Sequence, residues 1–147
     1  MATFQVVDEY GNYIASSGGA AGLDVNGDTY KAVLSNVAPT KAGTQILTDI
    51  TQIAGTGGYA AVTLANPTWA ETGGGTGIWQ FSADPFTWTA SGADFATARY
   101  VVIYDDTPTA PVDPVVGYAD LGSFVLANGF TLTITPGANG IFRLTVS

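Results

Sequence analysis

The most constraining feature of this sequence is an apolar alternation with a period near two, broken every few residues by Gly, Pro, Asn or Asp. Alternating side chains point to opposite faces of a strand, so one face can be buried while the other stays wet. The pattern is clearest in residues 130–134 and 142–146, which are apolar at every second position. Between them, Asn139-Gly140 readily takes positive φ. We therefore predict a C-terminal hairpin.

A second segment, residues 98–104, is apolar on both faces after Arg99. Such a run is typical of a central strand that is covered on both sides. We predict that it pairs with residues 115–121. The connection between them contains Pro108, Pro111 and Pro114 and is therefore expected to be a stiffened loop.

Other strands follow from the same pattern. Residues 79–81 and 86–88 alternate around Asp84-Pro85, which predicts a second hairpin. Shorter strands are expected at residues 30–34 and 61–64.

One segment has helical spacing instead. Ile46, Leu47, Ile50 and Ile53 recur with a period near 3.6, and Thr44 is a suitable N-cap. Glycines follow from residue 55. We predict a short helix near residues 45–54 that caps one end of the β core.

Together these elements predict an all-β fold, an antiparallel β-sandwich with one short helix. The strand spacing leaves a jelly-roll-like and an Ig-like order open. The length of 147 residues fits one domain. A Gly/Ala/Ser-rich tract at residues 16–22 divides residues 1–23 from a β-sandwich domain at residues 24–147. Residues 1–23 are interpreted as an N-terminal arm that docks elsewhere or as an edge strand, with the edge strand favoured.

Two residue types are missing. Without histidine, the chain lacks the usual general base and commonest metal ligand, and without cysteine it forms neither disulfides nor thiolate sites. We therefore expect no enzymatic activity, no cofactor, and no catalytic, cofactor-binding or metal-binding residue.

The charge balance bears on partners. The formal net charge is -8, and the only cationic side chains are Lys31, Lys41, Arg99 and Arg143. Binding to nucleic acid or to an anionic membrane is not expected, because both need clustered positive charge. The N-terminus has neither the basic start nor the apolar core of a signal peptide. Synthesis in a cytoplasm is expected.

Acidic residues gather in two places. Residues 24–28, Asp-Val-Asn-Gly-Asp, contain the residue types of a calcium loop, but their spacing departs from the EF-hand pattern and favours a turn. Asp105, Asp106 and Asp113 bracket the proline-rich loop and could hold Ca²⁺, although an acidic soluble loop is the plainer interpretation.

Further candidates are weaker. Glu9 and Glu71 are the only glutamates, and nothing in the sequence pairs either with an aspartate in the manner of a glycosidase. Residues 73–77 are glycine-rich but lack the Lys-Ser/Thr ending of a phosphate loop. The three tryptophans could form a sugar-binding face, but alternating aromatics are more often core, with Trp69 the best exception. These are Trp69, Trp79 and Trp88.

Several segments between residues 24 and 147 follow one another in the same order as in a known group of proteins. They are Asp28–Leu34, Asp49-Ile50 with Ile53, Gly58-Tyr59 with Leu64, Phe86–Trp88, Ala98–Asp106, Val116–Gly122 and Gly140–Leu144. In this order the chain resembles a family of small virion proteins from tailed bacteriophages.

The resemblance implies a structural protein, a capsid decoration (cement) or minor head protein. It would bind the major capsid protein on the outer head surface and stabilise capsomer contacts. A homo-oligomer is implied, for which we expect a trimer, and the location would be the virion. The family pattern carries no catalytic residue. Two alternatives remain open: a tail or head-fibre component of the virion, and a carbohydrate-binding module that uses Trp69 and nearby tyrosines.

Overall fold

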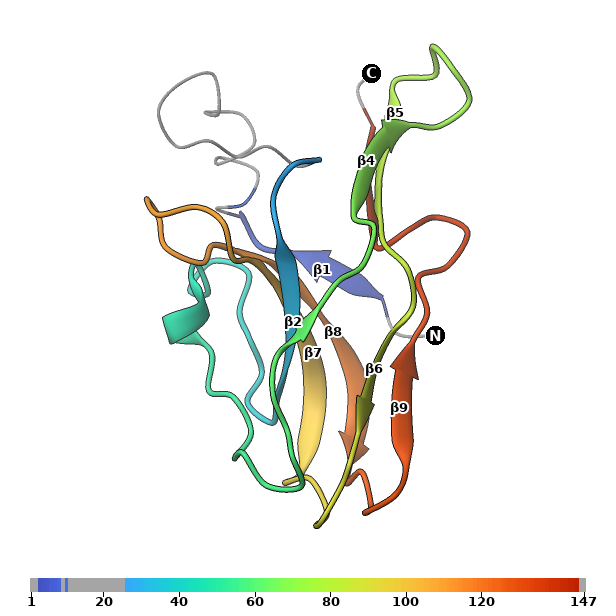
Figure 1. The fold of residues 1–147 in the computed structure, drawn as a ribbon. Helices are drawn as coiled ribbons and strands as arrows, with labels where there is room; N and C mark the ends of the chain where they lie inside the picture. The colour runs from blue at the N-terminus through green and yellow to red at the C-terminus, as the bar shows by residue number, and fades with distance from the viewer. Residues whose placement is uncertain (1–2, 9, 11–25, 146–147) are drawn as a thin grey trace.

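The computed structural model describes residues 3–8, 10 and 26–145, and these form antiparallel strands in two layers (Figure 1). The strands are β1 (Phe4–Val6), β2 (Tyr30–Ser35), β3 (Val62–Thr63), β4 (Thr68–Glu71), β5 (Ile78–Ser82), β6 (Phe86–Thr89), β7 (Ala98–Asp105), β8 (Val115–Phe124), β9 (Thr131–Ile134) and β10 (Phe142–Thr145). The prediction of an all-β antiparallel sandwich is confirmed.

The first layer is a five-stranded sheet in the order β1-β8-β7-β2-β3. β7 lies at its centre and pairs with β8 on one side and with β2 on the other. The predicted central strand and its partner are therefore confirmed, as are the shorter strands that became β2 and β3. Seven of the eight β7 residues are buried, with Arg99 the exposed one. This accounts for a sequence that is apolar on both faces.

The second layer consists of a three-stranded sheet, β10-β5-β4, and a two-stranded sheet, β6-β9. β5 and β6 follow each other closely in sequence, and β9 and β10 are their partners in the opposite direction. Between the two ladders, residues 82–85 on one side lie opposite residues 135–141 on the other. The layer is thus one long antiparallel pairing, interrupted in the middle.

Both predicted hairpins are therefore wrong. Residues 130–134 pair with β6 and not with residues 142–146, and residues 79–81 pair with β10 and β4 and not with β6. The physical reason lies at Gly140, whose φ is 67°. The turn there brings the Ile141 N–H to the Phe81 carbonyl at 2.7 Å, so the chain returns to the same neighbouring strand after its excursion.

The predicted helix near residues 45–54 is also wrong in extent. Only Leu47–Asp49 are helical, as a single 3-10 turn. Its start is fixed by the Asp49 carboxylate, which accepts the N–H groups of Gln45 and Ile46 at 2.9 and 3.0 Å. Thr44 is not the cap. Ile50 and Ile53 are buried, but they belong to an extended segment that packs on the core.

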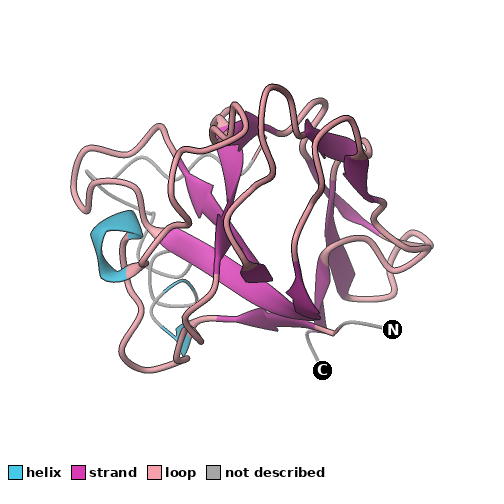
Figure 2. Cartoon of the chain, turned by 90° about the horizontal axis from the view of Figure 1, so that it is seen from below, coloured by secondary structure: helices cyan, strands magenta, loops and turns pink. Residues whose placement is uncertain are grey.

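The N-terminal residues contribute β1, an edge strand of the five-stranded sheet, paired with β8. The tract at residues 16–22 and the boundary near residue 23 lie outside the described residues. Seen from below, the strands of the two layers enclose the core and long loops join them (Figure 2). Within the described part of the chain, no helix is long and apolar enough to span a membrane.

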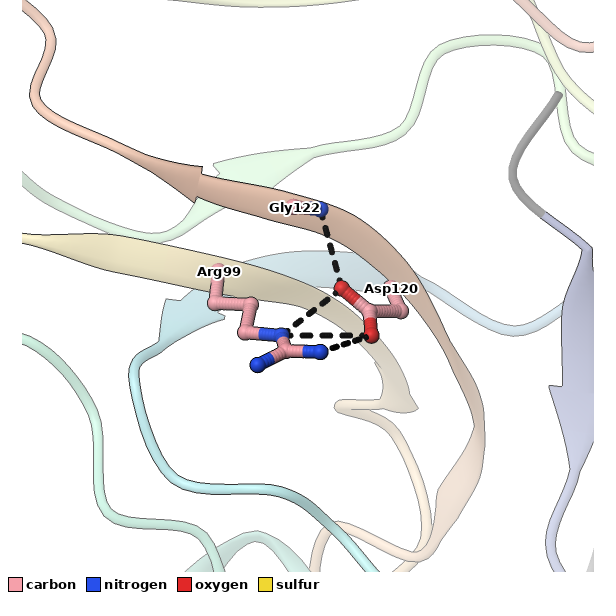
Figure 3. A network of polar contacts seen from close by, with 3 residues as sticks. All are labelled: Arg99, Asp120 and Gly122. Atoms are coloured by element: carbon pink, nitrogen blue, oxygen red, sulfur yellow. Dashed lines mark hydrogen bonds and ion pairs between the residues drawn. The ribbon is translucent and has the colours of Figure 1, made fainter.

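The β7–β8 ladder is irregular where β7 begins and β8 ends. The pairing register shifts between Ala98 and Tyr100, and Gly122 has a φ of 77°. Asp120 holds this bulge in place: it accepts two hydrogen bonds from the Arg99 Nε and one from Nη2 (2.8–3.2 Å), and one from the Gly122 N–H at 2.9 Å (Figure 3). These donors lower the pKa of Asp120.

Candidate functional site

An apolar groove with a volume of about 540 Å³ lies between the two layers. Its floor comes from β7 and β8, through Val101, Ile103 and Ala119, all of which are buried. Phe86 and Ile134 form the opposite wall. Residues 135–141, which lie between the two ladders of the second layer, also line the groove.

The rim of the groove is the 135–141 segment itself, Thr-Pro-Gly-Ala-Asn-Gly-Ile. None of the described residues that line the groove has a titratable side chain; the polar ones are threonines and Asn139. Acid-base chemistry needs a titratable group within reach of the reacting atoms. The lining of the groove is therefore suited to accepting apolar groups.

The three tryptophans divide into two kinds. Trp88 is core: it is 3% exposed and its Nε1–H donates to the Ala60 carbonyl at 2.9 Å. Trp69 and Trp79 stack on neighbouring strands of the three-stranded sheet, with ring centroids 6.0 Å apart and planes 19° from parallel. Trp79 is 37% exposed and Trp69 is half-buried. The pair is a rigid aromatic platform at the surface.

Glu71 has a structural task. Its carboxylate accepts the N–H groups of Gly75 and Gly77 at 3.0 and 2.8 Å. These bonds lower its pKa and order the glycine-rich loop that joins β4 and β5. Both Glu71 carboxylate oxygens are thus engaged by loop backbone. The other glutamate, Glu9, lies outside the described residues.

The three aspartates around the proline-rich loop do not converge. Asp105 ends β7 and is fully buried, whereas Asp106 forms an ion pair with Lys31 at 2.6 Å. Asp113 lies near the surface, with a φ of 49°. Within the described ranges, no cluster of three or more Asp or Glu side chains is placed to hold a metal ion.

The predicted turn at residues 24–28 is described from Asn26 onward. The Asn26 side chain binds the backbone of Trp69, accepting its N–H at 2.7 Å and donating to its carbonyl at 3.3 Å. Asp28 is buried near Asp105. Asn26 therefore joins the turn to β4, and Asp28 joins it to the core. Both contacts are structural.

Sequence reasoning missed the groove, since the groove depends on residues 135–141 being an excursion within one ladder and not a hairpin turn. The signal that could have indicated it is Ile134 and Ile141, apolar residues that flank the Gly/Pro segment on both sides. No family model, curated protein or solved structure matches the chain.

Proposed function

We propose that this chain is a bacteriophage structural protein, a capsid decoration protein that binds the outer head surface and stabilises contacts between capsomers. The proposal rests on the sequence resemblance given above, and the observation that carries it on the structural side is the apolar groove without titratable lining. The expected partner is the major capsid protein, and the expected assembly is a homo-oligomer at a symmetry axis of the shell.

Three properties of the chain suit this task. Two antiparallel layers give a rigid body. The groove is open and apolar, so an apolar side chain or loop of a capsid subunit could be buried in it with little competing desolvation of charge. The acidic surface, with a net charge of -8, favours association with a basic or mixed surface and opposes self-association.

Filling the groove tests the proposal. Ala138 lies exposed on the rim, and an Ala138→Trp substitution would place an indole at its mouth. We expect this variant to lose at least tenfold in affinity for phage heads purified without the decoration protein, measured by co-sedimentation, because about 1.4 kcal/mol of lost contact already gives that factor.

The matched control is Val112→Trp, which adds an indole at a residue that is 58% exposed and does not line the groove. It should bind as the wild type does. Density for the chain on the tail in a virion map, or no binding of the wild type to heads, would overturn the proposal and favour a tail or head-fibre role.

A carbohydrate-binding module is a second candidate, favoured by the Trp69–Trp79 platform. Flat, fixed aromatic faces suit the apolar faces of sugar rings. In that case a glycan array should show binding that Trp79→Ala abolishes and Ala138→Trp leaves intact. An array without any binding removes this candidate.

A further inference from the structure

The most unusual polar group in the described core is the Asp105 carboxyl. Asp105 is fully buried at the end of β7. Its Oδ1 accepts the Thr107 N–H at 3.1 Å, while its Oδ2 is buried without a hydrogen-bond partner. A buried carboxylate oxygen without a hydrogen-bond donor is costly, so one of its neighbours is expected to donate to it.

The group beside Asp105 is a second carboxyl. Asp28 is only 7% exposed, and the two side chains lie within hydrogen-bonding reach of each other. Two ionised carboxylates are both acceptors and repel each other, whereas one proton between them makes one carboxyl a donor. A single shared proton would therefore satisfy the Oδ2 that is otherwise unpaired and remove the repulsion.

The other groups facing Asp105 do not supply a positive charge. Tyr30 lies opposite it in the β2–β7 register, and the Tyr10 hydroxyl is 3.2 Å from that of Tyr30. Burial raises the pKa of both phenols, so they stay neutral. On the adjoining residues, the ammonium of Lys31 is engaged by Asp106. Among the described residues, no Lys or Arg side chain acts on the Asp105 carboxyl.

We propose that Asp28 and Asp105 take up one proton together when the chain folds, and that this proton controls how firmly residues 3–8 and Tyr10 dock on the sandwich. The connection runs through hydroxyl groups. Tyr30 lies beside Asp105, and Tyr10 contacts Tyr30 from the N-terminal segment. The same segment is held by the Val7 N–H on the Val116 carbonyl and the Asp8 N–H on the Lys41 carbonyl, both at 3.1 Å.

The pH window follows from the direction of the shift. Burial, with the nearby charge of Asp28, raises the pKa of Asp105 to about 7, from 3.8 when exposed. Between these values the folded chain binds more protons than the unfolded chain, so stability falls as the pH rises through the window and levels off above it. The chain has no histidine, so no other side chain titrates in this range at its ordinary pKa.

Thermal unfolding of the wild type and of Asp105→Asn from pH 5 to pH 8 tests the proposal. The amide keeps an oxygen for the Thr107 N–H and offers Asp28 a permanent donor. We expect the wild-type Tm to fall by roughly 5–10 °C across the window and the variant Tm to stay nearly constant. Hydrogen exchange in residues 3–8 and Tyr10, corrected for the intrinsic pH dependence, should quicken at pH 8 in the wild type alone.

The control is Asp8→Asn, which removes an exposed carboxylate from the same N-terminal segment and should keep the wild-type slope. If Asp105→Asn does not fold, the carboxyl carbons of the wild type are titrated by NMR instead. A carboxyl titrating near pH 7 supports the proposal, and none titrating above pH 5 overturns it. A rise in wild-type Tm on adding CaCl₂ at pH 8 that Asp105→Asn lacks would also overturn it, since the pair would then hold a cation.

Discussion

A Phe81→Ala variant is expected to lose about 3–5 kcal/mol of unfolding free energy, the usual cost of removing a large buried aromatic side chain. Phe81 is fully buried in β5. Its ring lies 4.8 Å from the ring of Tyr30, in the other layer, and 5.4 Å from that of Phe142. It therefore joins the two layers at the place where the second layer is interrupted, and the cavity left by alanine has backbone strands on both sides that restrict collapse.

Urea denaturation measures this loss. The midpoint should fall while the slope of free energy against urea stays unchanged, because the surface exposed on unfolding is nearly the same. The matched control is Phe130→Ala, at an aromatic residue that is 67% exposed, with an expected change within about 0.5 kcal/mol. A Phe81→Ala loss below about 1 kcal/mol would contradict the packing described here.

The strands themselves could be predicted from the sequence because each depends mainly on local alternation. β7 is the clearest example: its both-sided apolar pattern requires cover on both faces, and the centre of a sheet provides it. Its partner β8 follows from the short, proline-rich connection, which keeps the two strands adjacent. No long-range information was needed for this half of the fold.

Pairing in the second layer could not be predicted in the same way. A Gly/Asn/Pro segment between two alternating runs has the same sequence signature whether the chain reverses or only bulges out and resumes its path. At Gly140 the second outcome occurs, since a Cβ there would lie 2.4 Å from the Phe81 carbonyl and only glycine permits that approach. Whether the chain reverses or resumes its path depends on β5, about 60 residues earlier in the chain, and the local sequence pattern does not contain this information.

The candidate sites show the same limit. The groove is lined by residues 135–141, which interrupt one antiparallel pairing. The predicted C-terminal hairpin contains no such interruption, so it could not indicate the groove. The sequence groups Asp105 with Asp106 and Asp113 as acidic residues that bracket a proline-rich loop. Asp105 is instead the last residue of a central strand and is buried. The proposed proton sharing depends on Asp28, which is distant in sequence and is brought beside Asp105 by the fold.

The second large effect is expected at Gly117, near the start of β8. Gly117 pairs with Val6 of β1, and a Cβ built on it would lie 2.3 Å from the Gln5 carbonyl oxygen and 2.6 Å from the Phe4 ring. The first contact is with backbone, so no side-chain rotation relieves it. In Gly117→Ala, β1 must move away from β8, and we expect a loss of about 3 kcal/mol, at the upper end of overpacking costs.

Hydrogen exchange separates this local effect from general destabilisation. The amides of β1 should lose their protection in Gly117→Ala, while those of β6 and β9, which pair with each other in the second layer, remain protected at pH 5. Gly55→Ala is the matched control, because a Cβ there has no heavy atom within 4 Å, and it should leave both stability and exchange unchanged. If β1 stays protected in Gly117→Ala, the edge strand does not pack against β8 as closely as the structure indicates.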